Sequence, residues 1–438
     1  MPDDFRPPTQ LTADSFAARM RAASAPQSIA IAVSGGRDSI ALARLCAAWA
    51  KEAGAEVLAL TVDHGLRPEA KHEAEQTKHW CEAVGIAHRT LVWEGDKPAS
   101  RLQAAAREAR YRLLIEAAQA HQCGALLTAH TLDDQAETFF MRLSRGAGQR
   151  GLSAMREESL VASGAGEPLR LLRPLLDAGR DDVTAYLEGL GQEFVDDPSN
   201  LDDRYERVRV RALLAALSEQ ELISSQALAA SAQKLARADD AVRRSEDLLF
   251  DRFGGCFYAW GGASLDRWDK NAPSAAGLAR RLLHGVGGGD YAPEEAAAAD
   301  VFGAPGEGAA TLAGALIRRW GGRLWVMREP AALLGRAGVP AKALIHTKTP
   351  ILWDRRFIVT PELPDGVEIA PLGMADNADF SAQNGLFPGP PEGLAAAPGL
   401  YQRGVLIASP ALPSKGAETA NFRSLVIERF QGGVVRFP

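Results

Sequence analysis

The sequence has few cysteines, and none of them lie close together. Cys46, Cys81, Cys123 and Cys256 are the only four among 438 residues, and no C-x-x-C pair occurs. This spacing argues against a zinc knuckle, a disulfide scaffold and a redox pair. A reduced, cytoplasmic setting is therefore expected.

Long apolar runs are also missing. No stretch of about 18 uncharged apolar residues occurs, so neither a membrane span nor a membrane partner is expected. The N-terminal sequence MPDDFRPPTQLTADS contains acids and prolines and has no apolar core. A signal peptide is therefore not expected.

The chain carries no excess of positive charge. Its net charge is −6, with 46% hydrophobic and 24% charged residues, as in ordinary globular proteins. A general nucleic-acid coat protein is disfavoured, although a local basic patch can still bind RNA. The length predicts two or three domains.

Strand-like and helix-like segments alternate through the first third of the chain. Strands are expected at 28–33, 56–62, 87–93 and 125–130, and helices at 39–53, 69–84, 100–121 and 133–145. This alternation predicts an α/β fold with a parallel, doubly wound sheet. Right-handed crossovers would place helices on both faces of that sheet.

The pattern changes beyond residue 150. A helix is expected at 177–190, a helical connector continues to about residue 250, and short strands are expected at 323–329, 351–359 and 400–408. We therefore predict a doubly wound α/β domain at 1–225 and a smaller α+β C-terminal region. That region is divided into a helical connector with a second domain at 226–340 and a small domain at 341–438.

Four polar segments directly follow the four expected strands. They read SGGRDS, DHGLR, EGDKPAS and HTLDDQAET. The carboxyl ends of parallel strands meet at one edge of a sheet, where ligands bind. The sequence therefore predicts one site assembled from these dispersed segments.

The turn VSGGRDS (33–39) is the most specific of these segments. Backbone N–H groups and the dipole of the following helix favour an anion there, and glycines allow it a close approach. The turn has neither the G-x-x-x-x-G-K-[ST] pattern nor the G-x-G-x-x-G pattern. An ordinary turn capped by Ser34 or Asp38 is the competing interpretation.

The string S-G-G-x-D-S after a buried strand resembles the PP-loop of the N-type ATP pyrophosphatases, which cleave ATP between the α- and β-phosphates. The resemblance implies ATP as cosubstrate. It places the phosphates on Ser34, Gly35, Gly36, Arg37, Asp38 and Ser39. Asp38 would also hold Mg²⁺, a hard cation that prefers carboxylate and phosphate oxygens.

Further sequence strings distinguish between the PP-loop families. VDHGLR, AREARY, TAHTLDDQAET and DPSN followed by RYERVRVR together resemble the tRNA(Ile)-lysidine synthetase family over residues 28–215. The departures are mild: Ala129 and Thr131 replace the usual Gly and second His, Ala147 replaces Ser or Thr, and Glu206 replaces Asn. A fainter resemblance covers 275–330.

The resemblance implies a two-step ligase reaction that forms a C–N bond. ATP adenylates C2 of the wobble cytidine in the CAU anticodon of tRNA(Ile) and releases pyrophosphate. The ε-amine of free L-lysine then displaces AMP to give lysidine, which changes the codon read from AUG to AUA and the amino acid from Met to Ile.

The resemblance also implies roles for residues at the predicted site. Asp38, Arg107 and Arg110 would be catalytic, the two arginines binding phosphate or the cytidine. Asp134 and Glu137 would bind lysine, because carboxylates suit an ammonium group. The edge of the site would be formed by His64, Arg67, His130 and Asp133, which have no firm role.

The basic run after DPSN is a candidate for contact with the tRNA backbone. It consists of Arg204, Arg207, Arg209 and Arg211. The competing interpretation is a connector helix with ion pairs to nearby acids. Trp320, Trp325 and Trp353 are candidate stacking platforms for unpaired bases, although burial in a core is the usual place for tryptophan.

Two alternative functions stay open at this point. A tRNA thiolase of the same fold would need reactive cysteines, which the cysteine spacing does not supply. A non-catalytic RNA- or nucleotide-binding module is disfavoured by the acids at positions 38, 134 and 137. The sequence does not decide the oligomeric state, and a homodimer is left open.

Overall fold

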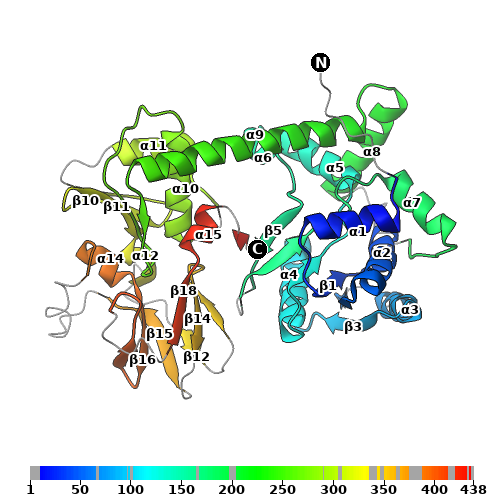
Figure 1. Ribbon diagram of the computed structural model, residues 1–438, viewed down its shortest axis with the longest axis horizontal. Coiled ribbons are helices and arrows are strands. Elements are labelled where there is room, and N and C mark those ends of the chain that lie inside the picture. The colour runs from blue at the N-terminus through cyan, green and yellow to red at the C-terminus, as the bar shows by residue number, and fades with distance from the viewer. Residues whose placement is uncertain are drawn as a thin grey trace. The chain divides into compact units, whose positions relative to one another are not determined.

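The computed structural model divides the chain into two compact units (Figure 1). It describes residues 10–65, 69–95, 97–98, 102–163, 167–196, 204–289, 291–303, 308–334, 343–345, 350–361, 366–373, 387–412, 420–431 and 434–435. The first unit contains most of the chain up to Asp240, and the second contains most of the remainder. The two predicted domain boundaries, after residues 225 and 340, stay predictions.

The first unit alternates strands and helices, as its sequence predicts. Its elements are α1 (Ala13–Ala22), β1 (Ser28–Ala32), α2 (Arg37–Ala53), β2 (Glu56–Asp63), α3 (Ala70–Ala83), β3 (Ala87–Val92), α4 (Leu102–Ala120), β4 (Ala125–Leu127), α5 (Leu132–Leu143), α6 (Gln149–Leu152), β5 (Glu158–Val161), β6 (Leu169–Leu172), α7 (Arg180–Gly189) and α8 (Glu206–Glu219). Helix α9 (Ser225–Arg252) begins in this unit and ends in the second.

The strands of the first unit form a sheet in the order β5-β6-β4-β1-β2-β3. The pairs β1–β2, β2–β3, β1–β4 and β4–β6 are parallel, and only β5 runs antiparallel to its neighbour β6. The sheet is therefore parallel-dominated, which confirms the predicted fold class.

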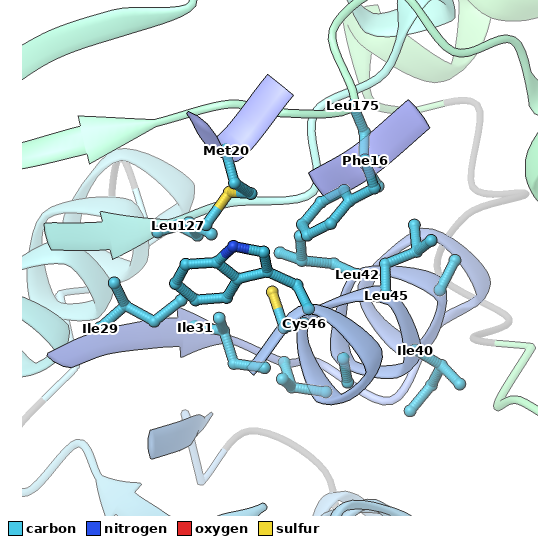
Figure 2. Close-up of a cluster of buried hydrophobic side chains, with 14 of the residues drawn as sticks. Phe16, Met20, Ile29, Ile31, Ile40, Leu42, Leu45, Cys46, Leu127 and Leu175 are labelled. Carbon is cyan, nitrogen blue, oxygen red and sulfur yellow. The ribbon is translucent and has the colours of Figure 1, made fainter. Parts of the chain in front are cut away.

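Apolar side chains cover both faces of this sheet. Ile29 and Ile31 point to one face, where they pack in a cluster with Phe16 of α1 and Leu45 of α2 (Figure 2). Ala30, between them, belongs to the cluster on the opposite face, together with residues of α4. Successive side chains of a strand alternate between faces, so the apolar residues 29–32 of β1 pack against helices on both sides of the sheet.

Strand β4 is shorter than predicted. The sequence favours a strand at 125–130, but β4 ends at Leu127. Thr131 is already the N-cap of α5, with extended backbone angles, so the chain must leave the sheet to begin that helix. His130 therefore lies in the loop at the carboxyl edge rather than in a strand.

The second unit is an α+β structure. Its helices are α10 (Ala275–Gly287), α11 (Glu295–Gly303), α12 (Pro330–Leu334), α14 (Pro391–Ala395) and α15 (Val426–Phe430). Its strands are β7 (Cys256–Phe257), β8 (Ala263–Leu265), β9 (Ala309–Leu312), β10 (Ala315–Trp320), β11 (Arg323–Arg328), β12 (Ala343–Ile345), β13 (Ile351–Trp353), β14 (Phe357–Pro361), β15 (Val367–Pro371), β16 (Pro398–Gln402), β17 (Val405–Ala408), β18 (Ala420–Ser424) and β19 (Val434–Val435). Three sheets have the orders β7-β8-β11-β10-β9, β12-β15-β16-β17 and β13-β14-β18.

Two segments predicted as single strands are hairpins instead. Residues 351–359 fold into β13 and β14, with Asp354 and Arg355 at positive φ between them. Residues 400–408 belong to β16 and β17, joined by Arg403 and Gly404, which also have positive φ. Two successive residues at positive φ make a tight reversal of the chain. Because apolar residues flank each turn on both sides, the hydrophobic pattern of the sequence does not reveal it.

Candidate active site

The turn after β1 has the geometry of an anion site. Ser39 Oγ accepts a hydrogen bond from the backbone N–H of Ser34 (3.1 Å) and donates one to the carbonyl of Gly36 (2.8 Å). Gly36 is the N-cap of α2 and provides no side-chain cap. The first N–H groups of this 17-residue helix therefore lack a side-chain acceptor from the cap residue, as an anion-binding turn requires.

Only glycine fits at position 35. Its φ is +88°, and a Cβ there would lie 2.6 Å from Thr77 Oγ1 on α3. The Gly35 carbonyl also accepts a hydrogen bond from the backbone N–H of Val195 (2.9 Å). The turn is therefore held in one conformation by α3 and by the segment after α7.

Asp38 is the carboxylate nearest the start of α2. Its Oδ1 lies 2.9 Å from Nε and 2.8 Å from Nη2 of Arg37, and its side chain is about one-third exposed. No group of three or more His, Cys, Asp or Glu side chains that could hold a metal occurs within the described residues. Mg²⁺ is commonly held by one or two carboxylates with phosphate oxygens and water, so Asp38 fits a metal that arrives with ATP.

The two acids predicted to bind lysine lie on one face of α5. Asp134 Oδ2 accepts hydrogen bonds from the backbone N–H (2.8 Å) and Oγ1 (3.2 Å) of Thr131, which closes a capping box. Burial alone would raise the pKa of Asp134, but Arg207, His130 and the Thr131 N–H lower it below its usual value. Asp134 therefore stays ionised.

Glu137 is almost fully buried and holds two arginines. Its Oε2 lies 2.6 Å from Nε of Arg207 and its Oε1 lies 2.7 Å from Nε of Arg211, while Arg207 Nη2 lies 3.2 Å from Asp134 Oδ1. The Glu137 side chain is only 3% exposed. Two members of the predicted tRNA-binding run therefore point at the predicted lysine carboxylates.

The other two arginines of that run are placed differently. Arg209 donates a hydrogen bond to the carbonyl of Arg204 (3.1 Å). Asp202, Asp203 and Glu206 are the acids expected as alternative partners of the run; the first two lie outside the described residues, and Glu206 pairs with Arg145. The contact of this run with RNA stays a prediction.

Arg107 and Arg110 of α4 lie against the ring of Tyr111. Their guanidinium carbons are 5.1 and 5.6 Å from the ring centroid. Burial lowers the pKa of Arg110, and the charges of Arg107 and Arg207 lower it further. Arg110 is thus electrostatically coupled to α8 as well as to its own helix, and the local excess of positive charge favours an anion.

Arg173 was not singled out from the sequence but lies at the same edge. It directly follows β6, is buried, and donates a hydrogen bond from Nη1 to the carbonyl of Arg156 (2.7 Å). Burial lowers its pKa, and the charge of Arg107 lowers it further. The run LRLL before it, which is apolar except for Arg170, is a fifth strand signal that could have identified it.

The predicted edge residues have separate surroundings. His130 Nδ1 lies 2.9 Å from Thr128 Oγ1, and burial lowers the His130 pKa to about 3, so this imidazole is neutral near pH 7. His64 packs edge-on against Trp93, and burial also lowers its pKa. Asp133 instead accepts a hydrogen bond from the backbone N–H of Arg180 (2.8 Å), at the first residue of α7.

Arg67, the remaining edge residue, lies outside the described residues. The structure thus places the phosphate turn, α4, α5 and α8 of the first unit close enough for their charged side chains to influence one another. It ties Asp133 to the start of α7 rather than to the other acids. The catalytic and binding roles of all these residues stay predictions.

Two of the three candidate stacking tryptophans are core residues. Trp325 is 1% exposed and Trp353 is 4% exposed, and each belongs to a buried apolar cluster. Neither can offer its ring to a base, so that interpretation is wrong for both. Trp320 is 41% exposed and keeps a face available.

A PP-loop domain model matches residues 9–217 of the chain. The tRNA(Ile)-lysidine synthase of Bradyrhizobium diazoefficiens is 45% identical over 55% of this chain and 64% of that protein. The chain thus spans slightly less than two-thirds of that relative. A solved U34-tRNA thiolase from Methanococcus maripaludis is 18% identical, with a TM-score of 0.44 over 51% of this chain and 78% of that one. This likeness is too distant to bear on activity.

Other relatives match over more of their length. The tRNA(Ile)-lysidine synthase of Methylobacterium nodulans is 39% identical over 70% of this chain and 92% of that protein. The tRNA(Ile)-lysidine synthase of Ruegeria pomeroyi is 36% identical over 80% of each. The chain therefore belongs to the tRNA(Ile)-lysidine synthase family.

Proposed function

We propose that this chain is a ligase that converts the wobble cytidine of a CAU anticodon in tRNA(Ile) to lysidine, using ATP and L-lysine. The observation that carries the proposal is the pair Asp134 and Glu137, a cation-binding site on α5 at the same sheet edge as the phosphate turn. Family membership supports the choice of reaction. Because the substrate is tRNA, we place the reaction in the cytoplasm.

In the first step, the C2 oxygen of the cytidine attacks the α-phosphorus of ATP, and pyrophosphate leaves. The phosphates lie on the N–H groups and hydroxyls of residues 34–39, where the N-terminus of α2 stabilises their charge. Mg²⁺ held by Asp38 would neutralise charge on the departing pyrophosphate. Arg107 and Arg110 supply further positive charge around the reacting phosphate or the cytidine.

In the second step, the ε-amine of lysine attacks C2, and AMP leaves with the C2 oxygen. Free lysine has a pKa of about 10.4, so it arrives as an ammonium group and must lose a proton before it attacks. Asp134 and Glu137 bind that ammonium group, and a carboxylate of the pair accepts the proton. The neutral His130 beside Asp134 adds no charge that would repel the ammonium group.

A thiolase is the nearest alternative, and the cysteines argue against it. Cys46, Cys81 and Cys123 are buried, and burial raises the pKa of each thiol, that of Cys81 to about 12. Thiols with raised pKa values are poor nucleophiles at neutral pH. The exposed Cys256 belongs to the second unit.

The test is incubation of the full chain with ATP, Mg²⁺, radiolabelled lysine and a tRNA(Ile) transcript with a CAU anticodon. We expect label in the RNA together with equimolar AMP and pyrophosphate. A parallel reaction with a sulfur donor in place of lysine tests the thiolase. RNA binding without AMP release would contradict the ligase proposal and favour a non-catalytic binding module.

A further inference from the structure

The carboxylates proposed to bind lysine already hold cations in the free chain. Arg207 and Arg211 lie one helical turn apart on α8, and both reach Glu137 with N–O distances of 2.6 and 2.7 Å. Glu137 is 3% exposed, whereas the two arginine side chains are 37% and 34% exposed. The carboxylate is thus buried beneath guanidinium groups that remain accessible from solvent.

These contacts leave little room for another cation. Both oxygens of Glu137 have short contacts with arginine, and Asp134 is shared between Arg207 and the cap of α5. An ionised carboxylate that is this deeply buried requires a positive partner. A lysine ammonium group can therefore reach Glu137 only by replacing at least one guanidinium group.

The phosphate turn offers the displaced arginines another partner. Burial tends to lower the pKa of Arg211, but its hydrogen bond to Glu137 and the charges of Glu137, Asp134 and Asp38 raise it overall. Arg211 therefore senses Asp38 of the phosphate turn as well as the acids of α5. Guanidinium groups bind phosphate oxygens well, and a partly exposed arginine can change rotamer without unfolding its helix.

We propose that Arg207 and Arg211 are exchangeable counter-cations that occupy the lysine site until a phosphate anion draws them from Glu137. The inference rests on the proposed function, because it takes Asp134 and Glu137 as the lysine site. It makes both arginines specificity-determining residues, since lysine must compete with them. It also couples the two sites, so lysine and phosphate each strengthen the binding of the other by the same factor.

The test is calorimetric titration of lysine into the full chain under three conditions. They are protein alone, protein with Mg²⁺ and a non-hydrolysable ATP analogue, and protein with the tRNA(Ile) transcript. We expect lysine affinity to rise roughly tenfold with at least one phosphate ligand, as is typical of coupled sites. The arm that responds identifies the nucleotide or the RNA as the source of the phosphate.

Two variants isolate the arginines. Arg207→Gln and Arg211→Gln keep an N–H donor but remove the charge, so lysine should bind more tightly without phosphate and the coupling should fall. Arg112→Gln is the matched control, because Arg112 forms an exposed ion pair with Glu116 on the surface of α4. This control should keep the wild-type affinities and the wild-type coupling.

Equal lysine affinity in all three conditions with the wild-type chain would overturn the proposal. So would folded glutamine variants that bind lysine more weakly, since the arginines would then support lysine binding instead of competing with it. If either variant unfolds, the wild-type chain still gives the reciprocal measurement, the affinity of the ATP analogue with and without lysine. Lysidine formation without any coupling would reject only this inference, whereas absence of product would reject the proposed function.

Discussion

At the scale of single residues, the site depends on charged side chains that are buried from solvent. Glu137 is buried against two arginines. The charge of Arg207 and the backbone N–H of Thr131 lower the pKa of Asp134 despite the burial of Asp134. Such positions are sensitive to substitution because the partner is left with an unpaired charge. Three predictions follow from individual side chains.

Asp38→Ala should reduce pyrophosphate release at least about a hundredfold, because the metal carrying the phosphates loses its carboxylate. Release of pyrophosphate in the presence of tRNA, ATP and Mg²⁺ is the measurement. Glu52→Ala, a change at an exposed carboxylate of the same helix that pairs with Arg21, should release it at the wild-type rate. Normal pyrophosphate release by Asp38→Ala would refute the role of Asp38.

Glu137→Ala should spare adenylation and weaken the use of lysine, because Glu137 is proposed to bind lysine directly and is linked to the phosphate site only through Arg207 and Arg211. The expected result is a KM for lysine raised about tenfold or more, with pyrophosphate release near wild type. Both are measured by single-turnover kinetics over a range of lysine concentrations. Equal loss of the two activities would count against a lysine site at this residue.

His130 should make the first unit less stable in acid. Its folded pKa of about 3 lies below the unfolded value of about 6.5, so the unfolded chain binds the proton more readily. The stability associated with neutral His130 is therefore complete above pH 6.5 and decreases as pH falls toward 3. Denaturant titrations between pH 4 and 7 should show a shallower pH dependence for His130→Asn than for wild type.

At the scale of elements, helix N-termini and strand ends bring the site together. The start of α2 presents N–H groups without a side-chain cap, and the capping box of α5 fixes Asp134 through Thr131. Packing holds α2 on the sheet, as the cluster around Phe16 and Leu45 shows (Figure 2), whereas Ala136 and Phe139 of α5 pack in a separate apolar cluster with residues of α8 and α9. The precision of the site therefore depends on a core that contains none of its chemistry.

Phe16→Ala should destabilise the first unit by about 3–5 kcal/mol, because the fully buried ring of α1 would leave a cavity. The measurement is hydrogen exchange of the β1 amides in increasing denaturant. Leu222→Ala is the comparison, since Leu222 is 65% exposed and should change stability by less than about 0.5 kcal/mol. Similar losses in both variants would show that α1 is not part of the cooperative core.

At the scale of the whole molecule, two compact units share helix α9. Proposed chemistry is confined to the first unit, whose sheet edge holds the phosphate turn and the acids. The second unit supplies strands and short helices, with a buried ion pair between Arg281 and Glu246 as part of its core. No helix in the described part of the chain is both long and apolar enough to cross a membrane.

Thiol labelling should report on both units at once. Under native conditions one thiol per chain, the exposed Cys256, should react rapidly with a disulfide reagent. Cys46, Cys81 and Cys123 should react only when the first unit opens, because burial raises their pKa values. Peptide mapping after brief labelling identifies the modified residue. Rapid labelling of Cys46 in the native chain would contradict the packing of α2.

The sequence by itself determined the doubly wound sheet and the identity of the turn at 33–39. Periodicity and the placement of glycine are local, so residues 28–145 reveal their strands and helices directly. The hairpins at 351–359 and 400–408 were missed because their apolar flanks continue through the turn, and the reversal depends on backbone angles.

Only the tertiary structure decided which charges meet. Sequence spacing placed Asp134 and Glu137 on one helix face. The basic run predicted contact of Arg207 and Arg211 with RNA, not with these acids, and no motif identified Arg173. In the fold, those two arginines lie against Glu137, some seventy residues away along the chain. A buried carboxylate pairs with the cation that lies nearest to it in the folded chain. For Glu137, that partner is set by the packing of α8 against α5 and not by the neighbours of Glu137 in the sequence.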